Sequence, residues 1–276
     1  MVMMRPLRSV LRFKLTLPIA ARIQTSLIDV FERSGDPDMR NRETVWLTDE
    51  EKDFVRSFLI EEDDDILAFN KPAGLPCQTR KTADQTLDKL LWAFAKSNGK
   101  RPRMVHRLDG ETSGIIIAAK TQPAAAALSR AFENREIKKI YLALVPGNAK
   151  RTTRVDSPIG IIRLEDGMQV SGIGGQPGVK DVKPALTRFH TLAVQDGVSL
   201  IECRPETGRM HQIRVHLAHA GFPIFGDAIY GDGRSASRLM LHAHRLQGPH
   251  PIGGQFDYTA PAPAEFEGFV GDQNAS

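Results

Sequence analysis

Apolar and polar residues alternate along the chain in two periods, one typical of strands and one typical of helices. Short apolar runs such as residues 115–119 indicate buried strands, whereas the apolar residues between 87 and 94 recur at helical spacing. The strands that this pattern predicts cover 65–70, 115–119, 140–145, 187–194, 198–204, 238–246 and 255–259. The helices that it predicts cover 48–59, 87–99, 121–134 and 210–220.

Capping and turn residues indicate where these elements begin and end. Thr48 and Glu51 have the spacing of a capping box at the start of a helix. Thr121 can cap the helix that follows it, and a proline in the first turn of that helix is a second signal of a helix start. Asp-Gly at 196–197 predicts a tight turn between two strands, and Gly221 is expected to end the helix before it.

Two segments are expected to lie outside regular elements. Residues 61–65 are acidic and typical of a solvated turn, because like charges repel one another. Residues 171–178 are rich in glycine and predict a flexible loop, without the lysine of a phosphate-binding loop or the spacing of a dinucleotide fingerprint. Strands that mostly follow one another, with a few helices between them, predict an α+β fold with a mixed or antiparallel sheet.

Composition narrows the class of protein. The 276 residues are 41% hydrophobic and 25% charged, which is ordinary for a soluble globular protein. The formal net charge of +4 suits an anionic partner such as nucleic acid. The two cysteines are far apart, which argues against a disulfide scaffold or a zinc ribbon. No apolar run is long enough to span a bilayer.

The first 45 residues differ from the rest of the chain. Residues 1–28 contain five arginines and lysines and no acid, and residues 34–45 have the polar, turn-rich composition of a linker. Such a segment can be an organelle transit peptide, a basic arm that touches RNA, or a simple extension. We expect a basic extension and linker over 1–45 and a single folded domain over 46–270, in a cytoplasmic protein, while organellar targeting stays open.

The segment 106–114, His-Arg-Leu-Asp-Gly-Glu-Thr-Ser-Gly, offers one carboxylate for chemistry. Asp109 lies on a loop that opens into an apolar strand, a frequent place for reactive groups, although the same residue could simply accept backbone hydrogen bonds in a turn. An ionised aspartate can serve as a nucleophile, a base or a stabiliser of a cationic sugar centre. No motif fixes a second acid nearby, which weighs against a glycosidase with two carboxylates.

Two further residues could assist that carboxylate. Tyr141 falls on an otherwise apolar strand, where it is either a core aromatic or a planar ring for stacking a base. Arg214 lies beside the buried face of a predicted helix and could reach a carboxylate in a cleft, or it could pair with a surface acid or a phosphate.

Metal and serine-hydrolase chemistry have weaker support. Several histidines are close together in sequence, but no His-Glu-x-x-His motif or placed acidic ligand accompanies them. The Gly-x-Ser-x-Gly turn of a hydrolase nucleophile does not surround Ser113. The histidines concerned are His211, His216, His219, His242 and His244.

Taken together, these segments resemble the RluA-type pseudouridine synthases over roughly residues 62–264. The stretch at 106–114 matches the His-Arg-Leu-Asp-x-x-Thr-Ser-Gly signature of that family completely. Further matching motifs are Asn-Lys-Pro-Ala-Gly-Leu at 70–75, Lys-x-Tyr-x-Ala-Leu-Val-x-Gly at 139–147, Lys-x-Ala-x-Thr-x-Phe at 183–189, Thr-Gly-Arg-x-His-Gln-Ile-Arg-Val-His at 207–216, Gly-Asp-x-x-Tyr-Gly at 226–231, Leu-His-Ala at 241–243 and His-Pro at 250–251. The chain departs from the family at 76–78, where Pro-Cys-Gln replaces a frequent Val-His-Pro.

The resemblance implies a mixed, largely antiparallel sheet with a central catalytic cleft. It implies that Asp109 is the catalytic aspartate, Tyr141 the active-site aromatic and Arg214 the basic partner, and that Arg107 helps to displace the target base. We expect further substrate contacts from these motifs, at His106, Thr112, Arg209, His211 and Gln212. The implied reaction needs no cofactor and no metal, and no appended RNA-binding module is recognisable in residues 1–60.

The implied function is conversion of specific uridines in structured RNA to pseudouridine, with large-subunit rRNA, tRNA or both as substrates. One alternative is a non-catalytic RNA-binding or chaperone protein of the same fold, and another is a metal-dependent hydrolase that uses the histidines. We expect a monomer whose partner is RNA and which has no contact with a membrane.

Overall fold

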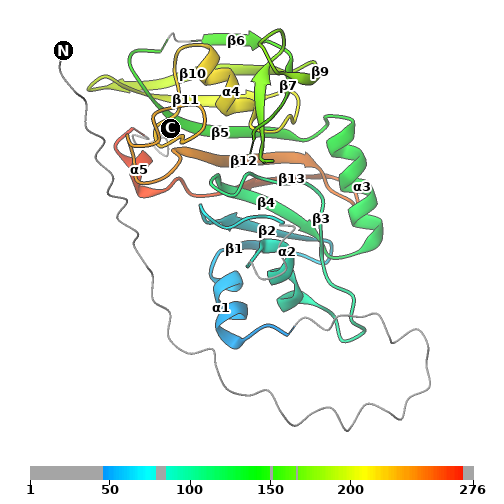
Figure 1. Ribbon diagram of the computed structural model, residues 1–276. Helices are drawn as coiled ribbons and strands as arrows, with labels where there is room; N and C mark the ends of the chain where they lie inside the picture. The colour runs from blue at the N-terminus through cyan, green and yellow to red at the C-terminus, as the bar shows by residue number, and fades with distance from the viewer. Residues whose placement is uncertain (1–45, 79–84, 150–151, 166, 270–276) are drawn as a thin grey trace, which may run out of the picture. The chain divides into compact units, whose positions relative to one another are not determined.

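A large mixed β-sheet forms the framework of the protein. The computed structural model describes residues 46–78, 85–149, 152–165 and 167–269. Within these residues the strand order is β1-β2-β4-β12-β5-β11-β10-β6, with β3 beside β4 and β13 beside β12 (Figure 1). The strands are β1 (Leu59–Glu62), β2 (Ile66–Lys71), β3 (Arg103–Met104), β4 (Ser113–Ala119), β5 (Lys138–Pro146), β6 (Thr152–Asp156), β10 (Leu186–Gln195), β11 (Val198–Pro205), β12 (Leu241–Pro249) and β13 (Gln255–Thr259).

Among the strand pairs of this sheet in the described residues, β4 and β12 run parallel and the others run antiparallel. The predicted α+β class with a mixed, largely antiparallel sheet is therefore confirmed. Both predicted hairpins are present, because β10 pairs with β11 around residues 196–197 and β12 pairs with β13. Asp196 and Gly197 both have positive φ, as a tight hairpin turn requires.

The helices follow from the caps seen in the sequence. Thr48 and Glu51 form the complete capping box, and the side chain of Thr121 accepts a hydrogen bond from the backbone of Ala124. The helices are α1 (Asp49–Ser57), α2 (Leu87–Leu90), α3 (Gln122–Glu133), α4 (Gln212–His219) and α5 (Ala264–Glu267), with the 3-10 turn η2 (Leu91–Phe94) directly after α2. Helix α3 packs against β4 and β12, and α4 packs against β10 and β11.

Several predicted boundaries are wrong, including those of the predicted strand 238–246, which instead runs from Leu241 to Pro249. The predicted helix 87–99 ends at Phe94, because Ala95 is extended and residues 96–99 form a separate turn. The predicted helix 210–220 begins only at Gln212, because His211 adopts a left-handed backbone conformation. Residues 61 and 62 of the expected acidic turn belong to the exposed end of β1.

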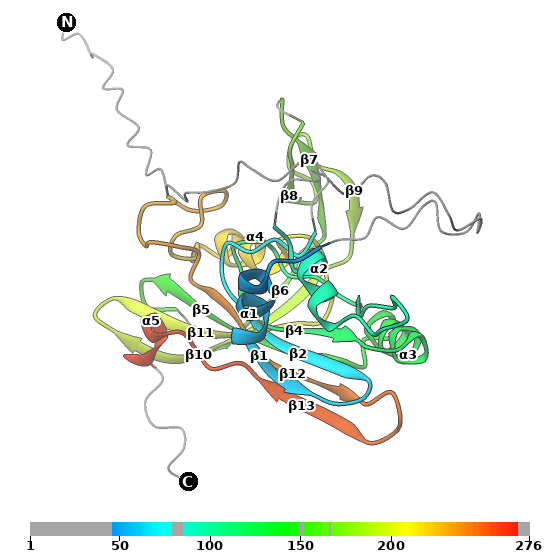
Figure 2. The ribbon, with the colours of Figure 1, turned by 90° about the horizontal axis from the view of Figure 1, so that it is seen from below.

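A second, three-stranded sheet lies beside α4, and the sequence pattern did not predict it. Its strands, in the order β8-β7-β9, are β7 (Ile159–Arg163), β8 (Gln169–Ile173) and β9 (Lys180–Lys183). Figures 1 and 2 show this small sheet on the side of the large sheet that carries α4. The expected loop 171–178 is wrong in its first part, because residues 171–173 are buried in β8. Gly172 fits there because an added Cβ would lie only 2.7 Å from the side chain of Val179.

The parallel pair β4–β12 brings two distant parts of the chain into close contact. Gly114 pairs with Ala243 and has a φ of 111°, and an added Cβ would lie 2.1 Å from the carbonyl oxygen of Ala243. Next to it, Ser113 Oγ lies 3.0 Å from Nδ1 of the buried His242. Because only glycine permits this approach, Gly114 fixes the start of β4 against the C-terminal part of the sheet.

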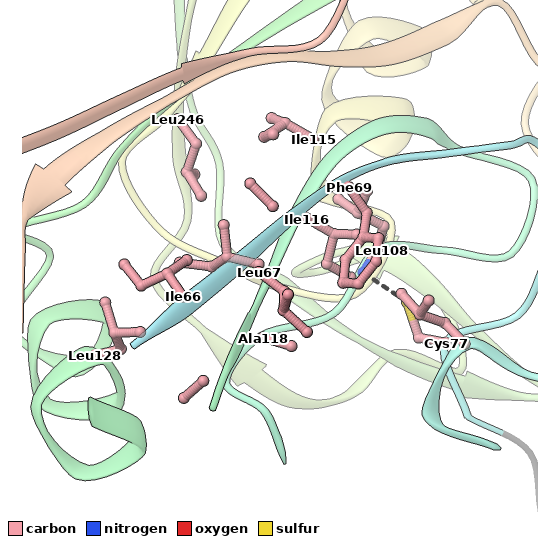
Figure 3. Packing of buried hydrophobic residues seen from close by; sticks show 14 of the residues in the cluster. Ile66, Leu67, Phe69, Cys77, Leu108, Ile115, Ile116, Ala118, Leu128 and Leu246 are labelled. Carbon is pink, nitrogen blue, oxygen red and sulfur yellow. Dashed lines mark hydrogen bonds between the residues drawn. The ribbon is translucent and has the colours of Figure 1, made fainter. Parts of the chain in front are cut away.

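Two hydrophobic clusters pack on this framework. The first, shown in Figure 3, joins β2 and β4 to α2 and α3 through residues such as Phe69, Ile116 and Leu128. The dashed line in Figure 3 marks the backbone N–H of Leu108, which donates a 3.3 Å hydrogen bond to Sγ of Cys77. The second cluster joins β5, β11 and β12 to α4 and α5, and Tyr141 packs against both clusters.

The described residues belong to one compact unit. The predicted basic extension and linker, residues 1–45, lie outside the described residues, so the division between extension and domain stays a prediction. No helix in the described part of the chain is long and apolar enough to cross a membrane.

Candidate active site

A buried lysine holds the loop that carries Asp109. Lys71, at the end of β2, is fully buried. Its ammonium donates hydrogen bonds to three carbonyl oxygens, those of Pro72, Leu75 and Gly110, at 3.0, 2.8 and 2.9 Å. Burial lowers the pKa of Lys71 to about 8, so the side chain is still charged at neutral pH. Lys71 therefore ties the residue that follows Asp109 to β2.

His106 and Thr112 fix the two ends of the same loop. Nε2 of His106 accepts a 3.0 Å hydrogen bond from the backbone N–H of Ile117, and its ring stacks on Phe132 with centroids 4.5 Å apart. Burial lowers the pKa of His106 to about 3, which keeps the ring neutral and able to accept this bond. The backbone N–H of the buried Thr112 donates to the carbonyl oxygen of Asp109 at 3.1 Å and closes a turn.

Arg214 approaches Asp109 from α4. Its side chain is 5% exposed, and Nη1 lies 3.6 Å from Oδ2 of Asp109. The other edge of the guanidinium donates from Nε and Nη2 to the carboxylate oxygens of Asp227, at 2.8 and 2.7 Å. Asp227 is fully buried and also accepts hydrogen bonds from the backbone of Ile229 and Tyr230. Although burial acts to raise it, the hydrogen bonds from Arg214 hold the pKa of Asp227 below its usual value.

His211 faces the same carboxylate from the first residue before α4. Its Nε2 lies 3.9 Å from Oδ2 of Asp109, and its Nδ1 lies 2.9 Å from the hydroxyl oxygen of Tyr230. That oxygen accepts a 2.8 Å hydrogen bond from the backbone N–H of Ser171 in β8. Burial raises the pKa of Tyr230 to about 12, so its hydroxyl keeps its proton and can donate to Nδ1. In the tautomer in which Tyr230 donates, Nε2 carries the ring proton and faces Asp109.

Tyr230 also supports Arg214. The guanidinium carbon of Arg214 lies 5.2 Å from the centroid of the Tyr230 ring, within the range of a cation–π contact. One tyrosine therefore positions both the arginine and the histidine that face Asp109.

Asp109, His211 and Arg214 line an open cleft of about 1350 Å³. Every residue that the sequence indicated as catalytic or substrate-binding lies on its wall: Asp109, Tyr141, Arg214, Arg107, His106, Thr112, Arg209, His211 and Gln212. Tyr141 enters from β5, where its backbone pairs with Cys203 and Ala243. Burial, together with the nearby charge of Asp109, raises the pKa of the Tyr141 phenol. The structure brings these residues together, and their roles stay predictions.

Two of these residues are engaged mainly with the protein itself. The amide oxygen of Gln212 accepts from Thr207 Oγ1 and from the backbone N–H of Arg209, and its nitrogen donates to the backbone of Leu186 and to Thr187. All four hydrogen-bonding positions of this amide are therefore satisfied within the fold. Arg209 donates a 3.1 Å hydrogen bond from Nε to the carbonyl oxygen of Pro184.

The cleft is positively charged. Its walls carry nine arginines and lysines against three acids, in addition to neutral and apolar groups. The cations are Arg107, Arg135, Lys138, Lys139, Arg188, Arg204, Arg209, Arg214 and Arg245, and the acids are Asp109, Glu133 and Glu206. Such a surplus attracts a polyanion and favours its entry into the cleft.

Four of the five histidines considered as metal ligands have other contacts, His211 with Tyr230 among them. His216 lies within 2.9 Å of Thr187 Oγ1 and of the carbonyl oxygen of Ser157, and His242 and His244 contact the carbonyl oxygen of Ala260. No group of three or more histidine, cysteine or acidic side chains is arranged to hold a metal ion in the described residues.

Comparison with known proteins agrees with this geometry. The family model for RNA pseudouridylate synthases matches residues 65–219, which include Asp109, Tyr141 and Arg214. The chain belongs to the RNA pseudouridylate synthase family. A protein of Chloroflexus aurantiacus named as an uncharacterized RNA pseudouridine synthase is 39% identical over 207 residues, which are 72% of this chain and 63% of that protein.

Two other members of the family are similar over most of this chain. The ribosomal large subunit pseudouridine synthase D of Zymomonas mobilis is 35% identical over 230 residues, covering 76% of this chain and 70% of that protein. The solved structure of human RNA pseudouridylate synthase domain containing 1 superimposes with a TM-score of 0.64 at 32% identity, covering 75% of this chain and 83% of that one. The matching region covers less than two thirds of the length of the Chloroflexus protein described above.

The site of this family member contains residues to which the sequence motifs had given no role. Lys71, Asp227 and Tyr230 all lie within matching motifs, but spacing alone did not show what they contact. One consideration could have pointed to Asp227: a buried arginine such as Arg214 needs an acidic partner, and Asp227 is an acid in a nearby loop. That inference needs the fold, because Asp227 is 13 residues away from Arg214.

Proposed function

We propose that the protein is an RNA pseudouridine synthase that acts on uridines of large-subunit rRNA, with tRNA as a second candidate substrate. Family membership supports this proposal, as does the similarity to the ribosomal large subunit pseudouridine synthase D of Zymomonas mobilis. The observation that carries it is the position of Asp109, which faces Arg214 and His211 inside a cationic cleft lined by Tyr141.

The proposed reaction is an isomerisation of the nucleotide. The bond between N1 of uracil and C1′ of ribose breaks, the freed base turns, and its C5 forms a new bond to C1′. The C5 proton leaves to solvent and N1 gains one, so the balance needs no oxidant, reductant or energy source. Asp109 either attacks C1′ directly or removes a proton from C2′ to give a glycal.

In both routes the aspartate acts as an anion. The guanidinium of Arg214, 3.6 Å away, stabilises that charge electrostatically, and the Nε2–H of His211 faces the same oxygen. Because the side chain of Asp109 is 31% exposed, it remains accessible to a ribose that enters the cleft.

Tyr141 holds the loose base in the proposed mechanism. Its raised pKa means that the phenol is protonated at neutral pH. The ring can stack on uracil while the hydroxyl donates a hydrogen bond. If Tyr141 also assists removal of the C5 proton, it must release its own proton in the same step.

The target nucleotide must leave the RNA stack before it can reach Asp109. Extrusion of a base costs a few kcal/mol and is easiest in loops. Arg107 is exposed at the cleft two residues before Asp109, where its guanidinium can fill the space left by the base.

The first test measures release of tritium from RNA labelled at C5 of uracil. We expect turnover by the wild type and a decrease of at least roughly 10³-fold for Asp109→Asn, because the amide is neither a nucleophile nor a base. Asp232→Asn, which changes a carboxylate in an exposed turn, is the matched control and should release tritium normally. RNA binding without tritium release by the wild type would support the alternative of a non-catalytic RNA-binding or chaperone protein.

A second experiment identifies the RNA. Pseudouridines mapped in rRNA and tRNA from cells with and without the gene should differ at sites in large-subunit rRNA. Sites that change only in tRNA would contradict the rRNA assignment and leave the chemistry intact.

The proposal includes a monomeric, cytoplasmic enzyme. Light scattering during size-exclusion chromatography tests the oligomeric state, and cell fractionation tests the location.

A further inference from the structure

One wall of the cleft carries positive charge that no acid neutralises. Arg107, Arg135 and Lys138 are exposed, line the cleft, and have no acidic partner among the described residues. Lys139 is partly buried, and its ammonium donates one long hydrogen bond, 3.4 Å, to the carbonyl oxygen of Thr207. An ammonium has three donors, so Lys139 has capacity for a further acceptor. We call Arg135, Lys138 and Lys139 the junction cations, because they lie where α3 leads into β5.

The junction cations adjoin the loop of Asp109. His106 stacks on Phe132 of α3, which brings the loop and the end of that helix into contact. The electrostatic effects agree with this arrangement. Burial is the main cause of the low pKa of His106, and the nearby charge of Lys139 lowers it further. Burial also lowers the pKa of Lys139, and the charge of Arg135 adds to this effect.

The other cations of the cleft are largely compensated. Arg188 pairs with Glu206, Arg204 with Glu202, and Arg245 with Asp257. Arg214 pairs with Asp227. Arg209, whose Nε donates to the carbonyl oxygen of Pro184, also has no acidic partner in the described residues. The remaining uncompensated charge of the cleft lies at Arg107 and the junction cations.

Arg135 has an unfavourable backbone for its residue type. Its φ is 61°, in the left-handed region where glycine is the usual residue and other L-residues are strained. Glycine at this position would relieve the strain but would remove the guanidinium from the cleft. The conformation itself follows from the end of α3, where the backbone N–H groups of Arg135 and Glu136 donate to the carbonyl oxygens of Phe132 and Ala131.

We propose that the junction cations bind backbone phosphates of the nucleotides next to the target uridine. Phosphates are multivalent acceptors that an arginine and two lysines can share, and an RNA strand is the phosphate-bearing partner that the proposed function supplies. The inference rests on that function, and it specifies the path of the strand along the wall between Arg107 and β5. Binding there does not depend on sequence, because phosphate contacts carry no base information.

The test measures how RNA affinity depends on salt. The probe is a labelled RNA stem-loop with uridines in its loop, titrated with Asp109→Asn and with the same protein carrying Arg135→Gln and Lys138→Gln. We expect the slope of log affinity against log salt to become shallower by about 1.5 and the affinity at low salt to fall roughly tenfold. The matched control replaces Lys96 and Lys100, which are exposed and do not line the cleft, by glutamine. A slope that changes as much in the control as in the test variant would overturn the proposal.

A single glycine substitution separates phosphate binding from folding. Arg135→Gly removes both the guanidinium and the strain, so we expect a melting temperature no lower than that of the wild type and a slope shallower by about 0.8. An unchanged slope would overturn the role of Arg135. Failure of the proposed function gives a different result. In that case the wild type releases no tritium, whatever the salt dependence of RNA binding.

Discussion

At the scale of single residues, Asp227 fixes the position of Arg214 without itself lining the cleft. It accepts two hydrogen bonds from Arg214 and two from the backbone of the following loop, and it is fully buried. The guanidinium of Arg214 can rotate little under these restraints, which keeps Nη1 directed at Asp109.

Asp227→Asn is expected to disturb both stability and activity. The amide leaves the buried guanidinium without its counter-charge, which typically costs about 3–5 kcal/mol of unfolding free energy. The arginine then moves relative to Asp109, and a misplacement of about 1 Å can lower kcat roughly 10²-fold. Urea unfolding and tritium release measure the two effects. Arg214→Lys is a second variant that keeps a positive charge but loses the bidentate pair, and normal kcat in both variants would contradict this role of Asp227.

Tyr230→Phe tests the contact that orients His211. The ring under Arg214 is kept, whereas the hydroxyl that contacts Ser171 and His211 is lost. We expect kcat to fall roughly tenfold, as after loss of one positioned hydrogen bond, with RNA affinity unchanged. Tyr258→Phe, which removes a more exposed hydroxyl 3.4 Å from Asp63, is the control. Equal kcat values for the two variants would show that the hydroxyl of Tyr230 has no part in catalysis.

At the scale of elements, the loop of Asp109 is held between β2, β4 and β12. Lys71 fixes one end through Gly110, and the contact of Gly114 with Ala243 fixes the other. The loop therefore depends on a strand pair that is distant in sequence, and a change in that pair should displace the carboxylate.

Gly114→Ala is expected to disrupt this pair. The new Cβ would lie 2.1 Å from the carbonyl oxygen of Ala243, so β4 and β12 must separate, with a loss of more than about 3 kcal/mol. Gly197→Ala is the matched control, because Gly197 also has positive φ but nothing lies within 4 Å of the added Cβ. That control should lose only about 1–2 kcal/mol. Equal losses in urea unfolding would refute the role of close strand approach.

The elements differ in how well their sequences predict them. Residues 187–194 alternate in burial, residues 199–201 form a short buried run, and an Asp-Gly turn lies between them, so the hairpin β10–β11 follows signals present in the sequence. The strand β9 is exposed throughout, so no apolar alternation marks it. In β8, glycine leaves space that neighbouring side chains need. The same glycine-rich composition predicts a loop when it is considered without the fold, so the strand is missed.

The site shows the same limit. Motif resemblance brought Asp109, Tyr141 and Arg214 together correctly as neighbours of one cleft. It could not show that Gln212 is engaged with Thr207 and the backbone, because these contacts arise only once α4 packs on β10.

At the scale of the whole molecule, buried neutral histidines make the fold sensitive to acid. Burial lowers the pKa of His242 from 6.5 to about 4 and that of His106 to about 3. His242 has Nδ1 next to Ser113 and Nε2 next to the carbonyl oxygen of Ala260. A carbonyl can only accept, so Nε2 carries the proton and Nδ1 accepts from the serine hydroxyl.

The expected pH dependence follows from linkage. Between pH 6.5 and about 4 the unfolded chain binds a proton at His242 and the folded chain does not. The stabilisation is therefore complete above pH 6.5 and is lost as the pH falls through this window, by about 1.4 kcal/mol per pH unit from this residue. Urea unfolding at several pH values gives the unfolding free energy as a function of pH. In His242→Asn the slope of this function between pH 4 and 6.5 should be smaller by that amount. The exposed His219→Asn controls for loss of a histidine, and an unchanged slope in the His242 variant would contradict the assignment.

The parallel contact between β4 and β12 also has a consequence for synthesis on the ribosome. Ser113 and His242 are 129 positions apart, so the strand that pairs with β4 emerges from the exit tunnel long after the loop of Asp109. A nascent chain halted before β12 would expose one edge of β4 and hold Asp109 on an unfinished loop. The proposed activity of such a chain must therefore await translation of the last strands.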